Sequence, residues 1–248
     1  MSKFLEKPFL PSSRVKTVIC GYNSVDFINY TKYLGLEVYY TEKNKCYDKR
    51  VETHADLSVF HLGGKKIVLH NQHALSETLT SIGMDVIDES SDRILIYPDD
   101  CSLNLFKLEQ TVFGKLSAAN QNVLNYCKAN GVDFANVKQG YAKCSTVLLD
   151  EHSFITDDTS IYNKGTELGF KCLLVSKGDV KLEGFDYGFI GGCAFKIDSD
   201  CLAFFGDVTK HRDYEQILRF TSCRGIKIEY LKDHDLYDVG SVIPLIEE

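Results

Sequence analysis

The chain reads Gly35-Leu36-Glu37-Val38 after its first stretch of helical periodicity, and this order of glycine, apolar, charged and apolar residue returns four more times. The other copies are Gly83-Met84-Asp85-Val86, Gly131-Val132-Asp133-Phe134, Gly169-Phe170-Lys171-Cys172 and Gly225-Ile226-Lys227-Ile228. Each glycine suits the left-handed position just past a helix end, and the alternating residues after it indicate a strand. The sequence therefore predicts five copies of one helix–strand unit.

The segment before each predicted helix is repeated as well. A short apolar strand leads to Asn, Ser or Asp, whose side chains accept hydrogen bonds from the free amides of a helix's first turn. The predicted caps are Asn23 or Ser24, Asn71, Ser117, Asp157 or Asp158, and Asp207. In four units another strand precedes this one, joined to it by a turn rich in Gly or Asp that suits a hairpin. These four strands are expected at 56–62, 93–97, 144–149 and 193–197.

The first unit lacks this extra strand, whereas the chain ends in a strand with no helix after it. We therefore expect residues 241–245 to pair beside residues 17–20 and to close a ring, which leaves no open sheet edge at the join. The predicted fold class is α/β, a five-fold pseudo-symmetric β/α propeller of strand–strand–helix–strand units. An open doubly wound sheet is the alternative, but it explains neither the hairpins nor the final strand.

One domain is expected over residues 1–248. The repeat units are predicted at roughly 14–40, 53–88, 92–136, 143–175 and 189–230, with residues 238–246 closing the first unit.

Composition narrows the classes of partner and compartment. A net charge of -7 argues against nucleic acid, whose phosphates need clustered Lys and Arg. No apolar run is long enough for a membrane helix, and residues 1–11 lack the apolar core of a signal peptide. The nine cysteines include no CxxC pair, and several lie in apolar runs, so we expect reduced thiols in the cytoplasm. Neither a metal nor a cofactor is expected, because paired ligands at short spacing are missing.

Five such units in a ring resemble the pentein fold, the β/α propeller of the guanidine-group-modifying enzymes. These include arginine, agmatine and peptidyl-arginine deiminases, dimethylarginine hydrolases and amidinotransferases, and a ribosome anti-association factor shares the fold without the chemistry. The run Thr53-His54-Ala55-Asp56-Leu57 resembles the Thr-Arg-Asp strand opening of the deiminases, whose Asp binds the substrate guanidinium. The resemblance implies that Asp56 is the carboxylate on the substrate side, since a carboxylate accepts two parallel hydrogen bonds from a planar cation.

The catalytic pair of that family is not matched. The family has a His in a His-apolar-Asp-Thr-Val-like run, and the corresponding run here is Lys143-Cys144-Ser145-Thr146-Val147, with Lys143 in place of the His. The family nucleophile is a Cys on the last strand, whereas residues 238–244 contain none. The resemblance therefore implies an uncharacterised branch without the usual thiolate and imidazole.

Residues at the start of the hairpins are expected to face a central channel. The candidate substrate-binding residues are Asp56, Asp92, Arg93, Lys143 and Ser241, and the candidate catalytic residues are Cys193, Cys144 and His54. A Cys beside Lys143 is a candidate nucleophile, and a His two residues from Asp56 on one strand face is a candidate base. The structural alternatives are packing for each Cys and a surface position for the His.

Three functions remain open from the sequence. The first is binding of a small cationic or guanidino-type metabolite in the channel, without turnover. The second is a Cys-dependent hydrolase or amidinotransferase whose nucleophile has moved to Cys144 or Cys193, and the third is a partner-binding scaffold without catalysis. We expect a small-molecule ligand, no nucleic acid and no membrane as partners, and no hydrolysis of arginine, agmatine or dimethylarginine at a rate typical of the family. The sequence leaves the oligomeric state undefined.

Overall fold

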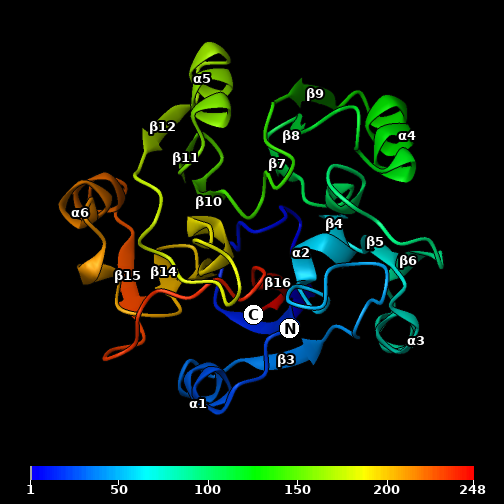
Figure 1. Cartoon of the computed structure of the whole chain (residues 1–248), viewed down its shortest axis with the longest axis horizontal. Helices are drawn as coiled ribbons and strands as arrows, with labels where there is room; N and C mark the ends of the chain where they lie inside the picture. The colour runs from blue at the N-terminus through cyan, green and yellow to red at the C-terminus, as the bar shows by residue number, and fades with distance from the viewer. Residues whose placement is uncertain (1) are drawn as a thin grey trace.

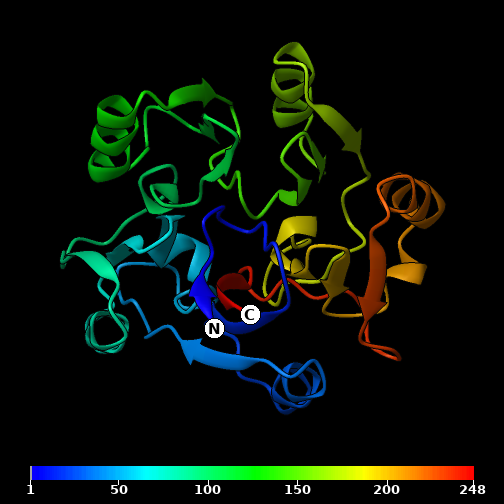
Figure 2. The ribbon, with the colours of Figure 1, turned by 180° about the vertical axis from the view of Figure 1, so that it is seen from behind.

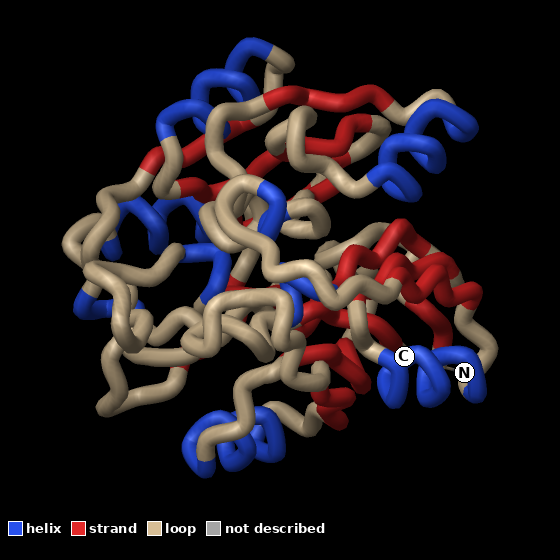
Figure 3. Tube along the Cα trace, turned by 45° about the vertical axis from the view of Figure 1, so that its right-hand side comes forward, coloured by secondary structure: helices blue, strands red, loops and turns tan. Residues whose placement is uncertain are grey.

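The computed structural model describes residues 2–248. These residues form five sheets that lie around the middle of the molecule, with the main helices toward the outside (Figure 1). Figure 3, turned by 45° about the vertical axis from the view of Figure 1, likewise shows most helices at the periphery.

Four of the sheets have three strands each in the order of the sequence. In each sheet the first two strands form an antiparallel hairpin, and the third lies parallel to the second after a crossover helix, as parallel neighbours require. The four sheets and their crossover helices are β4 (Val59–Gly63), β5 (Lys66–His70), α3 (His73–Ser81) and β6 (Asp85–Glu89); β7 (Phe106–Leu108), β8 (Thr111–Gly114), α4 (Gln121–Asn130) and β9 (Asp133–Asn136); β10 (Thr146–Asp150), β11 (Ser153–Thr156), α5 (Thr159–Glu167) and β12 (Lys171–Leu174); and β13 (Ala194–Asp198), β14 (Cys201–Phe204), α6 (Tyr214–Ser222) and β15 (Lys227–Tyr230).

The fifth sheet joins the two ends of the chain. Its strands are, in order, β1 (Lys3–Phe4), β16 (Ile243–Glu247), β2 (Val15–Cys20) and β3 (Glu37–Tyr40), with α1 (Val25–Tyr33) between β2 and β3. The last strand pairs antiparallel with β2, so that Ile243 lies opposite Ile19, and the predicted pairing is confirmed. The short strand β1 on the other side of β16 was not predicted. Figure 2 shows both ends of the chain together in the middle of the molecule.

The glycine pattern that indicated the repeat corresponds to five helix ends. Each of these glycines has a positive φ, between 63° and 93°, and a strand begins two residues after it: Gly35, Gly83, Gly131, Gly169 and Gly225. This backbone conformation is unfavourable for a residue with a Cβ, which explains why the same residue type returns at the same place in every unit.

The predicted caps are confirmed in two units. Ser24 accepts a hydrogen bond from the backbone of α1, and Asp158 accepts two from α5. The other three positions were wrong: α3 begins after Gln72, α4 after Asn120 and α6 after Asp213. Asp207 instead caps a separate 3-10 turn, η3 (Val208–Lys210).

The third unit differs most from the prediction. Residues 93–97 alternate like a strand, yet they form a loop in which Ile94 and Ile96 are 65% and 73% exposed. No strand of the described chain pairs with this segment, so its backbone gains no ladder hydrogen bonds. The hairpin of this unit comes later, as β7 and β8, and residues just after the loop form a 3-10 turn, η1 (Asp99–Cys101).

Two further observations concern the chain as a whole. All nine cysteines are free thiols. Within residues 2–248, no helix has the length and apolar character needed to cross a membrane.

Candidate functional site

The starts of four hairpins meet in the interior. Asp56 lies on the one-turn helix α2 (Ala55–Ser58) directly before β4, and Lys143 and Cys144 precede β10. Cys193 follows a 3-10 turn, η2 (Ile190–Gly192), and Ser241 lies just before β16. All five residues are at most 4% exposed. His54 and Asp56 were expected on one strand face, but they sit instead at the beginning of α2.

Asp56 is the centre of this cluster. Its Oδ2 accepts a hydrogen bond from the Ser241 hydroxyl at 2.5 Å and one from the Cys144 thiol at 2.6 Å. Its Oδ1 is buried and has no partner. Burial raises the pKa of Asp56, and the nearby Asp238 raises it further, against the lowering effect of His54.

Lys143 occupies the space beside Asp56 and Ser241. Its ammonium group donates to the backbone oxygens of Gly191 at 3.1 Å and Thr146 at 3.3 Å, and to the Ser241 hydroxyl at 3.3 Å. The nitrogen also lies 4.8 Å from the centre of the Phe9 ring. Burial lowers the pKa of Lys143, whereas Asp56, the thiols and Asp238 oppose that shift. Lys143 is thus held in place by three hydrogen bonds at the centre of the cluster.

Asp238 is a second buried carboxyl group, absent from the sequence prediction. It accepts hydrogen bonds from the backbone amides of Phe189 and Gly240, both at 2.9 Å. Burial raises its pKa to about 6 although both amides and Lys143 lower it. Gly240 has a φ of 75°, and a Cβ there would lie 2.2 Å from the ring of His54. A glycine is therefore required for the His54 imidazole to reach the site.

A cavity of about 260 Å³ opens beside this cluster. Its walls are mostly apolar and aromatic, and they come from the segments before β4, β10, η2 and β16. The lining residues are Val51, His54, Leu57, Tyr141, Cys144, Leu182, Phe185, Asp186, Tyr187, Phe189 and Asp238. The lining found among the described residues includes two carboxyl groups and neither Lys nor Arg. Asp56, Lys143 and Ser241 lie behind the wall and do not line the cavity.

Cys144 and His54 are the candidate catalytic residues that reach the cavity. The sulfur of Cys144, a nitrogen of His54 and an oxygen of Asp56 lie within 4.8 Å of one another. Burial raises the pKa of the Cys144 thiol well above its usual value, and Asp56 and Asp238 add to this effect. Burial also lowers the pKa of His54, which keeps the imidazole neutral. The thiol is therefore protonated until a base or a cation reaches it.

The remaining candidates lie outside the cavity. Cys193 is fully buried, and its thiol donates to the backbone oxygen of Ile190 at 3.2 Å, which fits a packing role. Asp92 and Arg93 were expected in the channel, and this placement is wrong because their segment is an exposed loop. Arg93 instead forms an ion pair with Asp99 at 2.7 Å.

Besides Asp238, two parts of the site were missed by sequence reasoning. Asn104 is fully buried, and its Oδ1 accepts hydrogen bonds from the amides of Lys143 at 2.8 Å and Cys144 at 3.1 Å. The only sign of this residue in the sequence is a polar amide side chain between two apolar residues, Leu103 and Leu105. The second is the aromatic loop, residues 182–189: Phe185, Tyr187 and Phe189 alternate along it, but this pattern was not used to predict the site.

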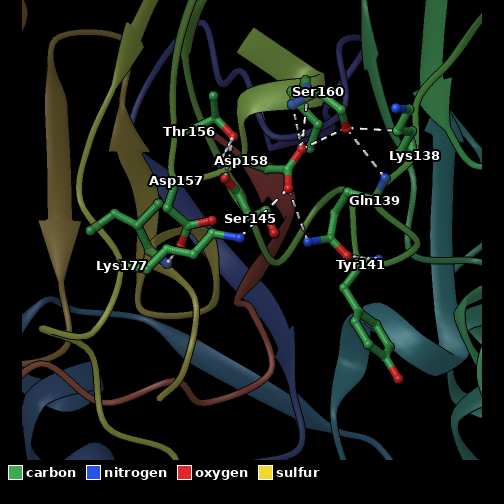
Figure 4. A network of polar contacts seen from close by, with 11 residues as sticks. Lys138, Gln139, Tyr141, Ser145, Thr156, Asp157, Asp158, Ser160 and Lys177 are labelled. Carbon is green, nitrogen blue, oxygen red and sulfur yellow. Dashed lines mark hydrogen bonds and ion pairs between the residues drawn. The ribbon is translucent and has the colours of Figure 1, made fainter. Parts of the chain in front are cut away.

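Asp157 fixes the backbone at the base of the aromatic loop. Its Oδ2 accepts a hydrogen bond from the amide of Ile190 at 3.0 Å, and it lies beside the Asp158–Ser160 cap and Lys177 (Figure 4). Burial raises its pKa to about 7. A carboxyl group that binds its proton more tightly in the folded state stabilises the protein fully below its unfolded pKa, near 3.8. This contribution is lost as the pH rises through the folded pKa.

We therefore predict that Asp157→Asn increases the free energy of unfolding at pH 8, by on the order of 3–4 kcal/mol at most. The amide oxygen of Asn keeps the bond to Ile190, while the cost of ionising a buried carboxyl group disappears. Urea unfolding at pH 5 and pH 8 measures the effect. The variant should lose less stability between these pH values than the parent, and an equal or larger loss would show that Asp157 does not titrate as described.

Comparison with known proteins gives the family. A family model with the description "Family of unknown function (DUF6873)" matches residues 19–243. The chain belongs to this family. No curated protein matched the DUF6873 chain in sequence.

Solved structures give the fold. The DUF6873 chain is similar to inosamine-phosphate amidinotransferase from Streptomyces griseus, with 9% identity, a TM-score of 0.59, and 95% of each chain covered. It is similar to an amidinotransferase of the saxitoxin biosynthetic pathway from Microseira wollei, with 9% identity and a TM-score of 0.57, over 96% of this chain and 91% of that one. The chain is also similar to an agmatine deiminase of C. jejuni, with 10% identity and a TM-score of 0.54. The match covers 95% of this chain and 94% of that one. The DUF6873 chain therefore has the pentein fold.

Proposed function

We propose that the cavity binds a small cationic ligand of guanidino or amidino type. The observation that carries this proposal is the lining, which combines aromatic rings with the buried carboxyl group of Asp238. Aromatic faces attract a flat cation, and a carboxylate bonds to its N–H groups. The volume of about 260 Å³ suits a metabolite of modest size.

The charged groups at and behind the cavity wall favour a cationic ligand. Two carboxyl groups, Asp56 and Asp238, share this interior with the amine of Lys143. An excess of buried negative charge is unfavourable unless a positive group compensates it. A ligand cation at the cavity wall supplies this compensation, so binding and ionisation of Asp238 favour each other.

The aromatic loop already contacts a guanidinium group of the chain itself. The Arg50 guanidinium lies 4.0 Å from the centre of the Phe185 ring, and it donates to the backbone oxygen of Gly184. The Asp48 carboxylate forms an ion pair with the same guanidinium group, at 2.6 Å. The face of Phe185 that Arg50 covers thus demonstrates the kind of contact proposed for the ligand.

The proposal includes the wider organisation of the chain. We take residues 2–248 as one domain whose five units are blades of an approximately five-fold propeller, with the ligand near the axis. The free thiols favour a reducing compartment, the cytoplasm. Solved proteins with this fold that are titled amidinotransferases and agmatine deiminase support the class of ligand.

A thermal-unfolding screen tests the proposal. Guanidines, amidines, primary amines and neutral amides of similar size are added to the protein separately. A guanidine or amidine present at about 100 times its Kd should raise Tm by about 5–10 °C. A screen in which neutral or anionic compounds stabilise the protein and cations do not would contradict it.

One observation favours a second function, thiol-dependent hydrolysis or amidino transfer. Cys144 and His54 reach the same cavity, with donor atoms within 4.8 Å. In such a reaction His54 takes the thiol proton, sulfur bonds to the amidino carbon, the bond from that carbon to the leaving amine breaks, and His54 returns the proton to the amine. Water then displaces the sulfur and yields a ureido product. The raised pKa of Cys144 opposes the first step, which ranks this function second.

We predict no release of ureido product from arginine, agmatine or dimethylarginine at a rate above the buffer background. The Cys144 thiol keeps its proton because burial raises its pKa, and other residues stand where this fold usually has the catalytic Cys and His. A colorimetric citrulline-type assay over these compounds provides the measurement, with Cys144→Ala and Cys193→Ala as matched variants. Turnover that Cys144→Ala abolishes and Cys193→Ala retains would establish the second function in place of simple binding.

A further inference from the structure

We propose that His54, Asp56 and Cys144 form a binding site for a thiophilic divalent metal ion of the zinc class. The three residues supply an imidazole nitrogen, a carboxylate oxygen and a sulfur, all within 4.8 Å of one another, and all three are buried. Ligands around tetrahedral zinc lie about 3.3–3.8 Å apart, so small side-chain rotations complete the geometry. Asp56 lies 88 positions before Cys144 in the chain, which is why no spacing motif revealed the set.

The spare oxygen of Asp56 is the strongest sign of a missing partner. Its Oδ2 already accepts two hydrogen bonds, from Ser241 and Cys144. Its Oδ1 is buried without any partner in the described structure, although a buried carboxylate oxygen normally has one. A metal ion between the three residues satisfies this atom.

The surroundings supply the outer contacts that metal ligands usually have. Ser241 donates to Asp56 and itself accepts from Lys143, which fixes the orientation of the carboxylate. The backbone before Cys144 is held by the Asn104 amide oxygen. His54 is packed against Gly240, where a side chain would collide with the ring.

The fourth position of the metal faces the cavity. His54 and Cys144 line the cavity and Asp56 lies behind it, so three protein ligands approach from one side. Three ligands and an open position are typical of zinc sites that bind a further molecule or water. A small neutral or anionic donor in the cavity is the class of ligand that such a metal binds.

Metal binding balances both protons and charge. The Cys144 thiol loses its proton to water when sulfur bonds the metal, and His54 binds as the neutral ring. The two positive charges compensate the carboxylate and the new thiolate. Affinity should therefore increase with pH. A bound metal and an organic cation compensate the same buried negative charge, so we expect them to compete for the site. When the metal is bound, the Cys144 sulfur is a ligand and cannot act as a nucleophile.

Cobalt(II) titration of the full-length protein tests the site. The exposed Cys223 is first replaced by Ser to remove a surface thiol. We expect one equivalent of Co²⁺ to give a thiolate-to-cobalt charge-transfer band, and Zn²⁺ to abolish it by displacement. In the same background, Cys144→Ser should lose the band, and Asp56→Asn should weaken Co²⁺ binding at least 10-fold. Cys193→Ala removes an equally buried thiol outside the site and should leave the titration unchanged.

Circular dichroism of each variant confirms that it is folded before titration. A folded parent without a saturable band, or a band that survives in Cys144→Ser, would overturn the proposal. Guanidine binding is measured separately with a chelator present. Failure of the metal site therefore leaves the cation-binding function standing, and failure of guanidine binding leaves the metal result unaffected.

Discussion

Replacing Lys143 by methionine is expected to destabilise the folded protein by about 3–5 kcal/mol at pH 8. Methionine fills most of the space of the lysine stem but removes the ammonium group. Gly191, Thr146 and Ser241 then lose a donor, and the carboxyl groups of Asp56 and Asp238 lose their buried cation. Urea unfolding provides the measurement.

A matched control comes from a second buried lysine. Lys196 is 4% exposed and donates to the backbone oxygens of Leu149 and Ser199, with no hydrogen bond to a carboxyl group. Lys196→Met should cost less, about 1–3 kcal/mol, because it leaves only neutral acceptors unpaired. At pH 5 Asp238 holds its proton, since its pKa is about 6, so the cost of Lys143→Met should fall there. If Lys143→Met lowers the free energy of unfolding by less than about 1 kcal/mol, or by the same amount at pH 5 and pH 8, this role of Lys143 is refuted.

The second large effect concerns ligand affinity. Asp238→Asn is expected to weaken guanidinium binding about 10- to 100-fold, because a charge-assisted hydrogen bond is worth about 1.5–3 kcal/mol. In the parent, affinity should rise between pH 5 and pH 7 as Asp238 ionises, and in the variant this rise should disappear. Isothermal titration calorimetry at several pH values measures both effects.

Asp157→Asn is the control for Asp238→Asn. Both carboxyl groups are buried and both hold an amide at the base of the aromatic loop, at Ile190 and Phe189 respectively. Only Asp238 lines the cavity. Asp157→Asn should therefore bind the ligand like the parent. Equal weakening in the two variants would show that the effect comes from the loop backbone and not from the charge of Asp238.

The repeat could be predicted from sequence because its signals are local. A glycine past a helix end is required by the sign of φ, and the alternation after it reflects a half-buried strand. The third unit was misjudged because residues 93–97 alternate without a partner strand, and pairing is not visible in a single segment. Asp92 and Arg93 were misplaced for the same reason, since they belong to this unpaired segment and are exposed on the surface.

The site could be predicted only residue by residue. Each of these residues was identified from its position at the start of a predicted strand: His54, Asp56, Lys143, Cys144 and Ser241. Their contacts depend on how separate sheets pack against one another. Asp238 and the aromatic loop contribute the cavity wall through backbone geometry that no short motif encodes. The carboxyl groups of Asp56 and Asp238 and the thiol of Cys144 come from segments that precede three different sheets, so no single segment of the sequence shows them together.

The most direct test of the cation-binding function compares a guanidine with its neutral urea isostere. Arginine with citrulline, and agmatine with its ureido analogue, have nearly the same shape but differ in charge. Isothermal titration calorimetry of the parent protein at pH 7.5, with a chelator present, should show each guanidine binding at least about 10-fold more tightly than its isostere. Equal affinities, or tighter binding of the ureas, would contradict the account.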